Sequence, residues 1–188
     1  MTSGLLRPAA KRRRLAFRYR TTLDATLVGG SANEPLVVTY GFEPTLSPGS
    51  GPLGNTSPFL SSYGPVEFII EIGGDTVTAS GPGTGITVFS NLSAEGVDQY
   101  ELRAPYCTGK LFGFHVGFFR VLLVDQDAAT FPTTDLPLTP AFADAIDFSQ
   151  VNLQLIDTIV GHTDLGFSES STTPVSERKG ITLRSSHF

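Results

Sequence analysis

Three carboxylates, those of Asp125, Asp127 and Asp135, lie among threonines and prolines in the stretch 124–140, VDQDAATFPTTDLPLTP. Together with main-chain carbonyls and threonine hydroxyls they could hold a hard cation such as Ca²⁺, which takes about six to eight oxygen ligands from flexible loops. The spacing is not that of an EF-hand, because the central glycine and the distal glutamate are missing. Asp and Thr also form ordinary turns by hydrogen bonding to their own backbone. The pattern therefore favours a connector, with a Ca²⁺ site as the alternative.

Two further carboxylates, Asp144 and Asp147, flank a helical turn that we expect in AFADAIDF. Capping of that turn is the simpler interpretation of Asp144. Paired carboxylates for glycoside hydrolysis must face each other across a cleft, about 5–10 Å apart. Nothing in the spacing pairs any two of these aspartates, so no catalytic residue is predicted.

The single cysteine, Cys107, could form a thiol–imidazole pair only with His115 or His162. No recognised catalytic signature surrounds it, and a lone cysteine usually behaves as a small buried hydrophobe. His115 interrupts an apolar strand and has no second histidine at strand spacing, which disfavours metal ligation. The sequence also lacks a G-x-S-x-G elbow, a Walker-type phosphate loop and an H-E-x-x-H helix. An enzyme is therefore not expected.

Charge is distributed very unevenly along the 188 residues, whose net charge is −5. Seven of the basic residues lie before Thr21, whereas the segment 21–175 contains only Arg103, Lys110 and Arg120. An acidic body repels nucleic acid and anionic membranes, so any polyanion is expected to bind the N-terminal segment, and nucleic acid is not expected as a partner. No apolar run approaches the length of a membrane span. The printed chain also shows a basic cluster, KRRR, without the apolar core of a signal peptide.

Alternating apolar and polar residues indicate the strands that must position these side chains. FRYRTTLDATLV and PLVVTYGF alternate, VEFIIEI and TVTAS flank a GGD turn, and GITVFSN and VDQYELRA form another pair. LFGFHVGFFRVLLV is apolar on both faces and predicts a central strand covered on both sides or a long strand bent across two layers, in which the glycines mark a bulge or a close approach. SQVNLQLIDTIV and HTDLGFSES are read as closing strands. EPTLSPGSGPLGNTSPFLSSYGP is predicted to be an irregular loop because it is rich in Pro, Gly and Ser.

Short strands separated by turn signals predict an all-β fold, a two-sheet antiparallel β-sandwich of the jelly-roll type. We expect a basic N-terminal tail over residues 1–15, one sandwich domain over 16–170 and a C-terminal tail over 171–188. A chain of this length can bury a core without disulfides or metals.

The order of TLVGG, VEFIIEIGGDTVTAS, GITVFSN, VDQYELRA, LLVDQDAATFPTTDLPLTP and FADAIDFSQVNLQLID resembles that of uncharacterised bacterial secreted proteins of the PEP-CTERM sorting-signal group, over roughly 17–166. The sorting signal itself is not in the printed chain. The resemblance implies an exported β-sandwich in the extracellular matrix or at the cell surface.

The sequence thus leads to a non-catalytic exported or cell-surface domain with a structural or binding role towards a matrix component, a glycan or its own copies. The alternative is a sandwich-fold polysaccharide-active enzyme using loop carboxylates. A less favoured alternative is a small viral capsid protein, in which KRRR would belong to a basic arm that neutralises nucleic acid.

Overall fold

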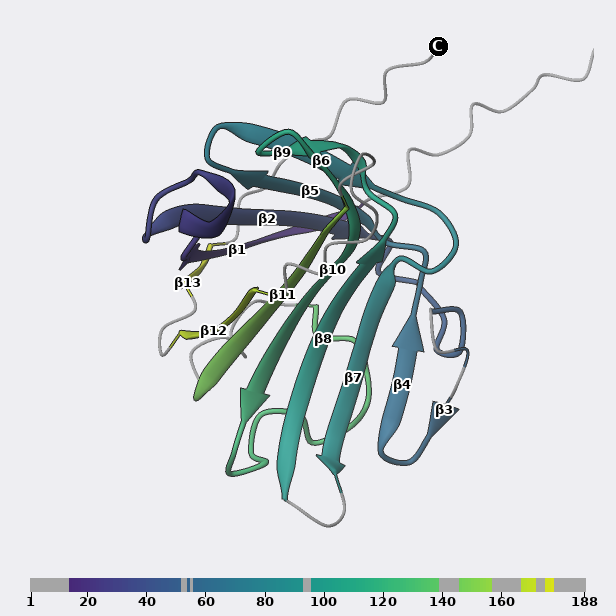
Figure 1. Cartoon of the computed structure of the whole chain (residues 1–188). Helices are drawn as coiled ribbons and strands as arrows, with labels where there is room; N and C mark the ends of the chain where they lie inside the picture. Colours follow the sequence, from purple (N-terminus) through teal and green to yellow (C-terminus); the bar gives the residue numbers. More distant parts are fainter. Residues whose placement is uncertain are drawn as a thin grey trace, which may run out of the picture.

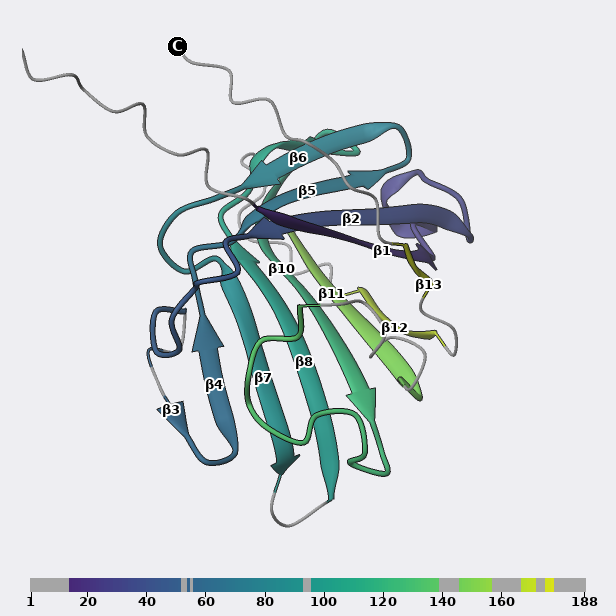
Figure 2. The same cartoon turned by 180° about the vertical axis from the view of Figure 1, so that it is seen from behind.

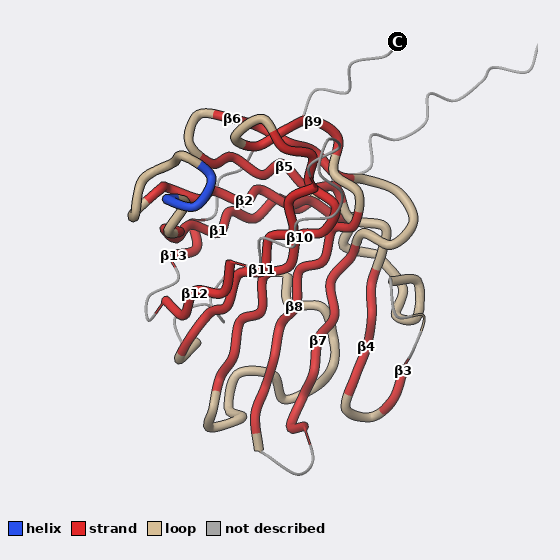
Figure 3. Tube along the Cα trace, in the orientation of Figure 1, coloured by secondary structure: helices blue, strands red, loops and turns tan. Residues whose placement is uncertain are grey.

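The computed structural model describes residues 14–51, 54, 56–92, 96–138, 146–156, 167–171 and 175–177. Within this part the regular structure consists of strands, apart from one short 3₁₀ helix at Thr26–Val28, and no helix there is long and apolar enough to cross a bilayer. Figure 3 shows this dominance of strands. The predicted all-β class is therefore confirmed.

The strands are β1 Leu15–Leu23, β2 Glu34–Phe42, β3 Thr56–Ser57, β4 Leu60–Tyr63, β5 Glu67–Ile72, β6 Asp75–Ala79, β7 Gly85–Leu92, β8 Val97–Pro105, β9 Thr108–Leu111, β10 Phe114–Asp125, β11 Phe148–Ile156, β12 Phe167–Ser171 and β13 Val175–Glu177. All pairings among them are antiparallel, in the order β13-β1-β2-β5-β6-β9-β10-β8-β7-β4-β3, with β11 beside β10 and β12 beside β11. Because β9 is hydrogen-bonded to both β6 and β10, the ladder is continuous. The expected division into two separate sheets is not confirmed.

The continuous sheet curls so that β1 and β2 lie across the inner face of β11, β10 and β8 (Figures 1 and 2). We call β13, β1, β2, β5 and β6 the β1 half, and β12, β11, β10, β8, β7, β4 and β3 the β10 half. Across the gap between the halves, the Tyr19 hydroxyl donates a 2.7 Å hydrogen bond to Ser149 Oγ, and the rings of Tyr40 and Tyr100 lie 6.4 Å apart. These contacts join the inner faces of the two halves into one core.

The core follows from the period-two pattern, because alternate residues of every long strand point to the same side. The inward residues of β1 and β2 include Phe17, Tyr40 and Phe42. The ring of Phe17 stacks on the rings of both Tyr40 and Phe42, and the ring centroids are 5.4 Å apart in each pair. In β10 the buried residues include Phe119 and Val121, both fully shielded from solvent. Burial of such side chains contributes about 1.5–3 kcal/mol each, which is the main stabilising term of this fold.

The strongest local turn prediction is confirmed at GGD. Gly73 and Gly74, with φ of 60° and 86°, connect β5 to β6 and supply the left-handed conformation that such a two-residue turn needs. The predicted pairing of GITVFSN with VDQYELRA is also confirmed, as β7 with β8.

The expected single strand over 111–124 is wrong in its first part. The chain turns tightly at Phe112 and Gly113, with φ of 52° and 84°, so that Leu111 ends β9 and Phe114 begins β10. Gly117 fits the expectation better, since it lies at a register shift in the β10–β11 pairing. β11 approaches this position so closely that a Cβ atom at Gly117 would lie 2.4 Å from Cδ1 of Ile156. Glycine is therefore the residue that fits at the bulge.

Three other expectations are corrected or fall outside the described residues. The proline-rich loop contains β3 and β4, and β4 pairs with β7, where its residues Ser61 and Ser62 are buried. The first predicted strand ends at Leu23, and the 3₁₀ turn follows. Most of the helical turn expected around Asp144 lies outside the described residues, while Phe148 already belongs to β11.

Candidate functional site

The aspartate-rich stretch after β10 crosses the inner face of the β10 half and covers the part of the core that the β1 half leaves open (Figure 2). We call its described part, residues 126–138, the connector. Phe131 of the connector is 4% exposed and stacks on Tyr100 of β8, with ring centroids 6.1 Å apart. Leu136 also packs against the core. The connector is therefore a cover for the hydrophobic core, and its polar residues hold it in place.

Asp125 is the first of these residues and is 1% exposed at the end of β10. Its Oδ1 accepts the backbone N–H of Asp127 at 3.1 Å, and its Oδ2 accepts those of Ala129 at 3.1 Å and Thr130 at 2.9 Å. Burial raises the pKa of Asp125, but the hydrogen bonds from Thr130 and Asp127 outweigh it and bring the pKa below its usual range. The ionised carboxylate thus fixes the first turn of the connector.

Asp98, which the sequence analysis missed, fixes the next part. It is fully buried at the start of β8 and lies directly opposite Asp125 in the ladder. Its Oδ2 accepts the backbone N–H of Phe131 at 2.6 Å. One aspartate begins the strand VDQYELRA and the other ends the strand before the connector, so antiparallel pairing of β8 with β10 would have placed them together. That pairing was not among the predicted hairpins.

Three more hydrogen bonds hold the connector to strands from distant parts of the chain. Ser90 Oγ donates to the carbonyl of Phe131 at 2.6 Å, and the hydroxyl of Tyr63 donates to the carbonyl of Thr134 at 2.8 Å. Ser61 Oγ donates to Thr134 Oγ1 at 2.9 Å. The first two of these bonds satisfy main-chain carbonyls of the connector, and the third fixes the side chain of Thr134.

The other two candidate ligands, Asp127 and Asp135, are exposed. Asp127 hydrogen bonds to Asp125, and this contact between two carboxyl groups raises the pKa of Asp127. Asp135 accepts a 2.9 Å bond from the hydroxyl of Thr133. The structure thus brings Asp125 and Asp127 together. Within the described ranges, no group of three Asp, Glu, His or Cys side chains is arranged to hold a metal ion. The Ca²⁺ site stays a prediction.

Of the remaining sequence candidates, Asp147 contacts the connector, and the others lie apart from it or outside the described residues. Asp147 Oδ2 accepts the backbone N–H of Gln126 at 2.6 Å, so it helps to fix the start of the connector. Burial raises the pKa of Cys107 to about 11, which keeps its thiol protonated at neutral pH. His115 is exposed on β10, and Asp144 and His162 lie outside the described residues.

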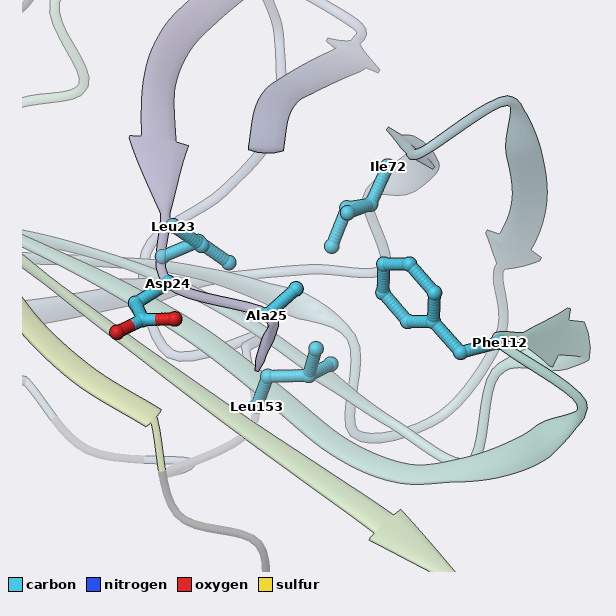
Figure 4. Close-up of a pocket in the computed structure, with 6 residues that line it drawn as sticks. All are labelled: Leu23, Asp24, Ala25, Ile72, Phe112 and Leu153. Carbon is cyan, nitrogen blue, oxygen red and sulfur yellow. The ribbon is translucent and has the colours of Figure 1, made fainter. Parts of the chain in front are cut away.

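A small hollow lies between the ends of the two halves, and Figure 4 shows the side chains around it. Its empty volume is about 180 Å³, and its lining is apolar except for one carboxylate: Leu23, Asp24, Ala25, Ile72, Phe112 and Leu153. That carboxylate is already bonded to the hydroxyl of Thr26 at 2.7 Å. Pockets for small molecules usually measure about 300–1,000 Å³, whereas the enclosed part of this hollow does not admit even a water molecule. The hollow is therefore a packing gap under the Phe112 turn.

No protein-family model matches the chain, and no curated protein or solved structure matches it either. The class that the fold and the site define is an antiparallel β-domain whose buried aspartates hold a core-covering loop.

Proposed function

We propose that this chain is a non-catalytic, exported or cell-surface β-domain that acts as a structural or binding module for a matrix component, a glycan or its own copies. The observation that carries the proposal is the use of the buried carboxylates. Asp98 and Asp125 are bonded to the backbone of the connector, so they stabilise the fold rather than present acid–base groups to a substrate. The resemblance of the sequence to the PEP-CTERM group supports the exported setting.

We also propose a more specific architecture for the curled sheet. The curled sheet serves as a two-layer, jelly-roll-like β-sandwich, with the β1 half as one layer and the β10 half as the other. The Tyr40–Tyr100 ring contact and the Tyr19–Ser149 hydrogen bond across the two layers support this description. Rigid sandwich domains of this kind present broad sheet faces and loop ends to their partners.

One observation favours the rival, a polysaccharide-active enzyme. Asp125 and Asp127 are neighbouring carboxyl groups whose pKa values are shifted in opposite directions, a feature shared with catalytic pairs. Both carboxylates, however, accept backbone N–H groups of the connector itself, from Ala129 and Thr130, so they are held in a turn and do not face each other across a cleft as glycoside hydrolysis requires. The capsid alternative depends on KRRR, most of which lies outside the described residues.

The experiment that separates these functions incubates the purified chain with soluble polysaccharides, both neutral and acidic. Release of reducing ends reports hydrolysis, while affinity electrophoresis and sedimentation report binding and self-association. We expect binding or self-association without release of reducing ends above a heat-inactivated sample. Release by the wild-type chain that is lost in Asp127→Asn would establish the enzyme instead.

A further inference from the structure

All three basic residues of the acidic segment 21–175 come together on one face of the sheet. Arg103 on β8 lies directly opposite Arg120 on β10, and Lys110 on β9 lies directly opposite His115 on β10. Directly opposed residues of an antiparallel pair point to the same side. Residues widely separated in sequence thus produce a local concentration of positive charge on a chain whose net charge is −5.

This face points away from the core. The residues that alternate with Arg103 and Arg120 are Leu102, Ala104, Phe119 and Val121, and all four are fully buried in the core. The outward side is the broad surface of β11, β10, β8 and β7 turned to the viewer in Figure 1, whereas the connector crosses the opposite side in Figure 2. Val116 is buried in the core, so its neighbour His115 points outward, and His115 and the opposed Lys110 are both exposed.

The charges on this face are only partly neutralised. Arg120 pairs with Glu101, with Nε 3.2 Å from Oε1. Arg103 instead places its guanidinium 5.3 Å from the ring centroid of Phe118. In the part of the chain that the structure describes, neither Arg103 nor Lys110 has a carboxylate within ion-pair distance. Two cations therefore face solvent without a neutralising partner.

Amide and aromatic groups flank these cations. Asn152 on β11 lies opposite Arg120, and Gln154 lies opposite Phe118. Tyr106, which is 84% exposed, follows the end of β8, and its backbone N–H bonds to the carbonyl of Gly117 at 3.0 Å. Amides can bond to hydroxyl groups in both directions, and aromatic rings can pack against apolar faces of a ligand.

We propose that this cationic face, formed by Arg103, Lys110, Arg120, Phe118, Asn152 and Gln154, binds an acidic polysaccharide. The inference rests on the proposed binding role and names the surface and the ligand class. Carboxylate or sulfate groups of the polymer pair with Arg103 and Lys110, and its hydroxyl groups bond to the amides. Charge complementarity directs the anionic polymer to this face within the segment 21–175, because the rest of that segment is acidic and repels it.

The same face is poorly suited to nucleic acid. Non-specific binding to nucleic acid draws its affinity from many phosphate contacts, commonly about 6–10. Here only three fixed cations are present, and one of them is paired with Glu101. One side of the Phe118 ring is already covered by Arg103, which leaves no row of free rings on which successive bases could stack.

The test uses the full chain and polygalacturonate in affinity electrophoresis at low salt. The same polymer with its carboxylates methyl-esterified tests the requirement for charge. Arg103→Gln and Lys110→Gln each remove one cation from the face. Arg14→Gln removes the same charge from the β1 half, where Arg14 pairs with Glu67. Far-UV circular dichroism verifies that each variant is folded.

We expect the wild type to bind polygalacturonate and not its ester. Each variant on the face should lose about fivefold in affinity, which corresponds to one Lys or Arg beside an anionic surface, and Arg14→Gln should keep wild-type affinity. Equal losses in Arg14→Gln and the face variants would overturn the proposal, as would tighter binding of oligo-dT than of polygalacturonate.

The proposed function can fail separately from this inference. If no acidic polysaccharide binds but the chain binds a neutral glycan or associates with itself, the cationic face is refuted while the binding module stands. If reducing ends are released in the same incubations, the non-catalytic role is refuted.

Discussion

Replacement of Asp125 by alanine tests whether this carboxylate is structural. The substitution removes the acceptor of three backbone N–H groups in the connector. Two of these donors belong to the exposed residues Asp127 and Ala129 and can turn to water, whereas Thr130 is half-buried. Loss of the bond from Thr130, which water cannot replace, should cost about 1.5–3 kcal/mol, and loss of the bonds from Asp127 and Ala129 should cost less. The expected loss is about 3 kcal/mol in the free energy of unfolding.

Urea denaturation followed by far-UV circular dichroism measures this loss, since the chain has no tryptophan. Asp135→Ala is the matched control, because that carboxylate belongs to the same connector but is exposed and should change the stability by less than about 0.5 kcal/mol. The wild type and both variants are measured with and without a chelator. If Asp125→Ala were as stable as Asp135→Ala, the structural role would be wrong. A loss that disappears in chelator would assign the stabilisation to a bound cation.

Three further predictions follow from the connector. The lowered pKa of Asp125 means that its stabilisation is fully present above the unfolded pKa, about 3.9, and is lost as the pH falls through the folded pKa. The difference in stability between wild type and Asp125→Ala should therefore shrink when urea denaturation is repeated at increasingly acid pH, and a constant difference would contradict this origin. Phe131→Ala should cost about 3 kcal/mol and lower the melting temperature, because the ring is buried against Tyr100, while Phe59→Ala on the exposed β3–β4 turn should cost much less. Added Ca²⁺ should leave the melting temperature unchanged if the connector is held by its own hydrogen bonds, and a rise that the chelator reverses would support the Ca²⁺ site.

Most strands could be predicted because each carries its own signal. Alternation gives β1, β2 and β5, and the paired glycines at 73 and 74 give the first reliable hairpin. β4 was missed because its serines resemble loop residues, and their suitability for a strand depends on β7 beside them. The turn at Phe112 was missed because a phenylalanine with φ of 52° is rarely found at such a position.

The candidate site was less predictable than the strands. The spacing of Asp125 and Asp127 indicated a turn, and the structure contains one. Asp98 and Ser90, however, act on the connector through pairings between strands that are far apart in sequence. Local patterns carry no information about such pairings. The cationic face was hidden for the same reason, since Arg103 and Arg120 become neighbours only through the register of β8 and β10.

The position of Phe131 in the chain has a consequence for synthesis. Phe131 completes the core over Tyr100, but it follows Asp98 by 33 residues. At ribosomal speeds of about 5–20 residues per second, synthesis of these 33 residues takes roughly 2–7 s. The connector cannot cover the apolar side of β7 and β8 during this interval. During that interval the nascent chain exposes Tyr100 and its neighbours to other chains. The part of the core around Tyr100 is therefore completed only after the connector has been synthesised.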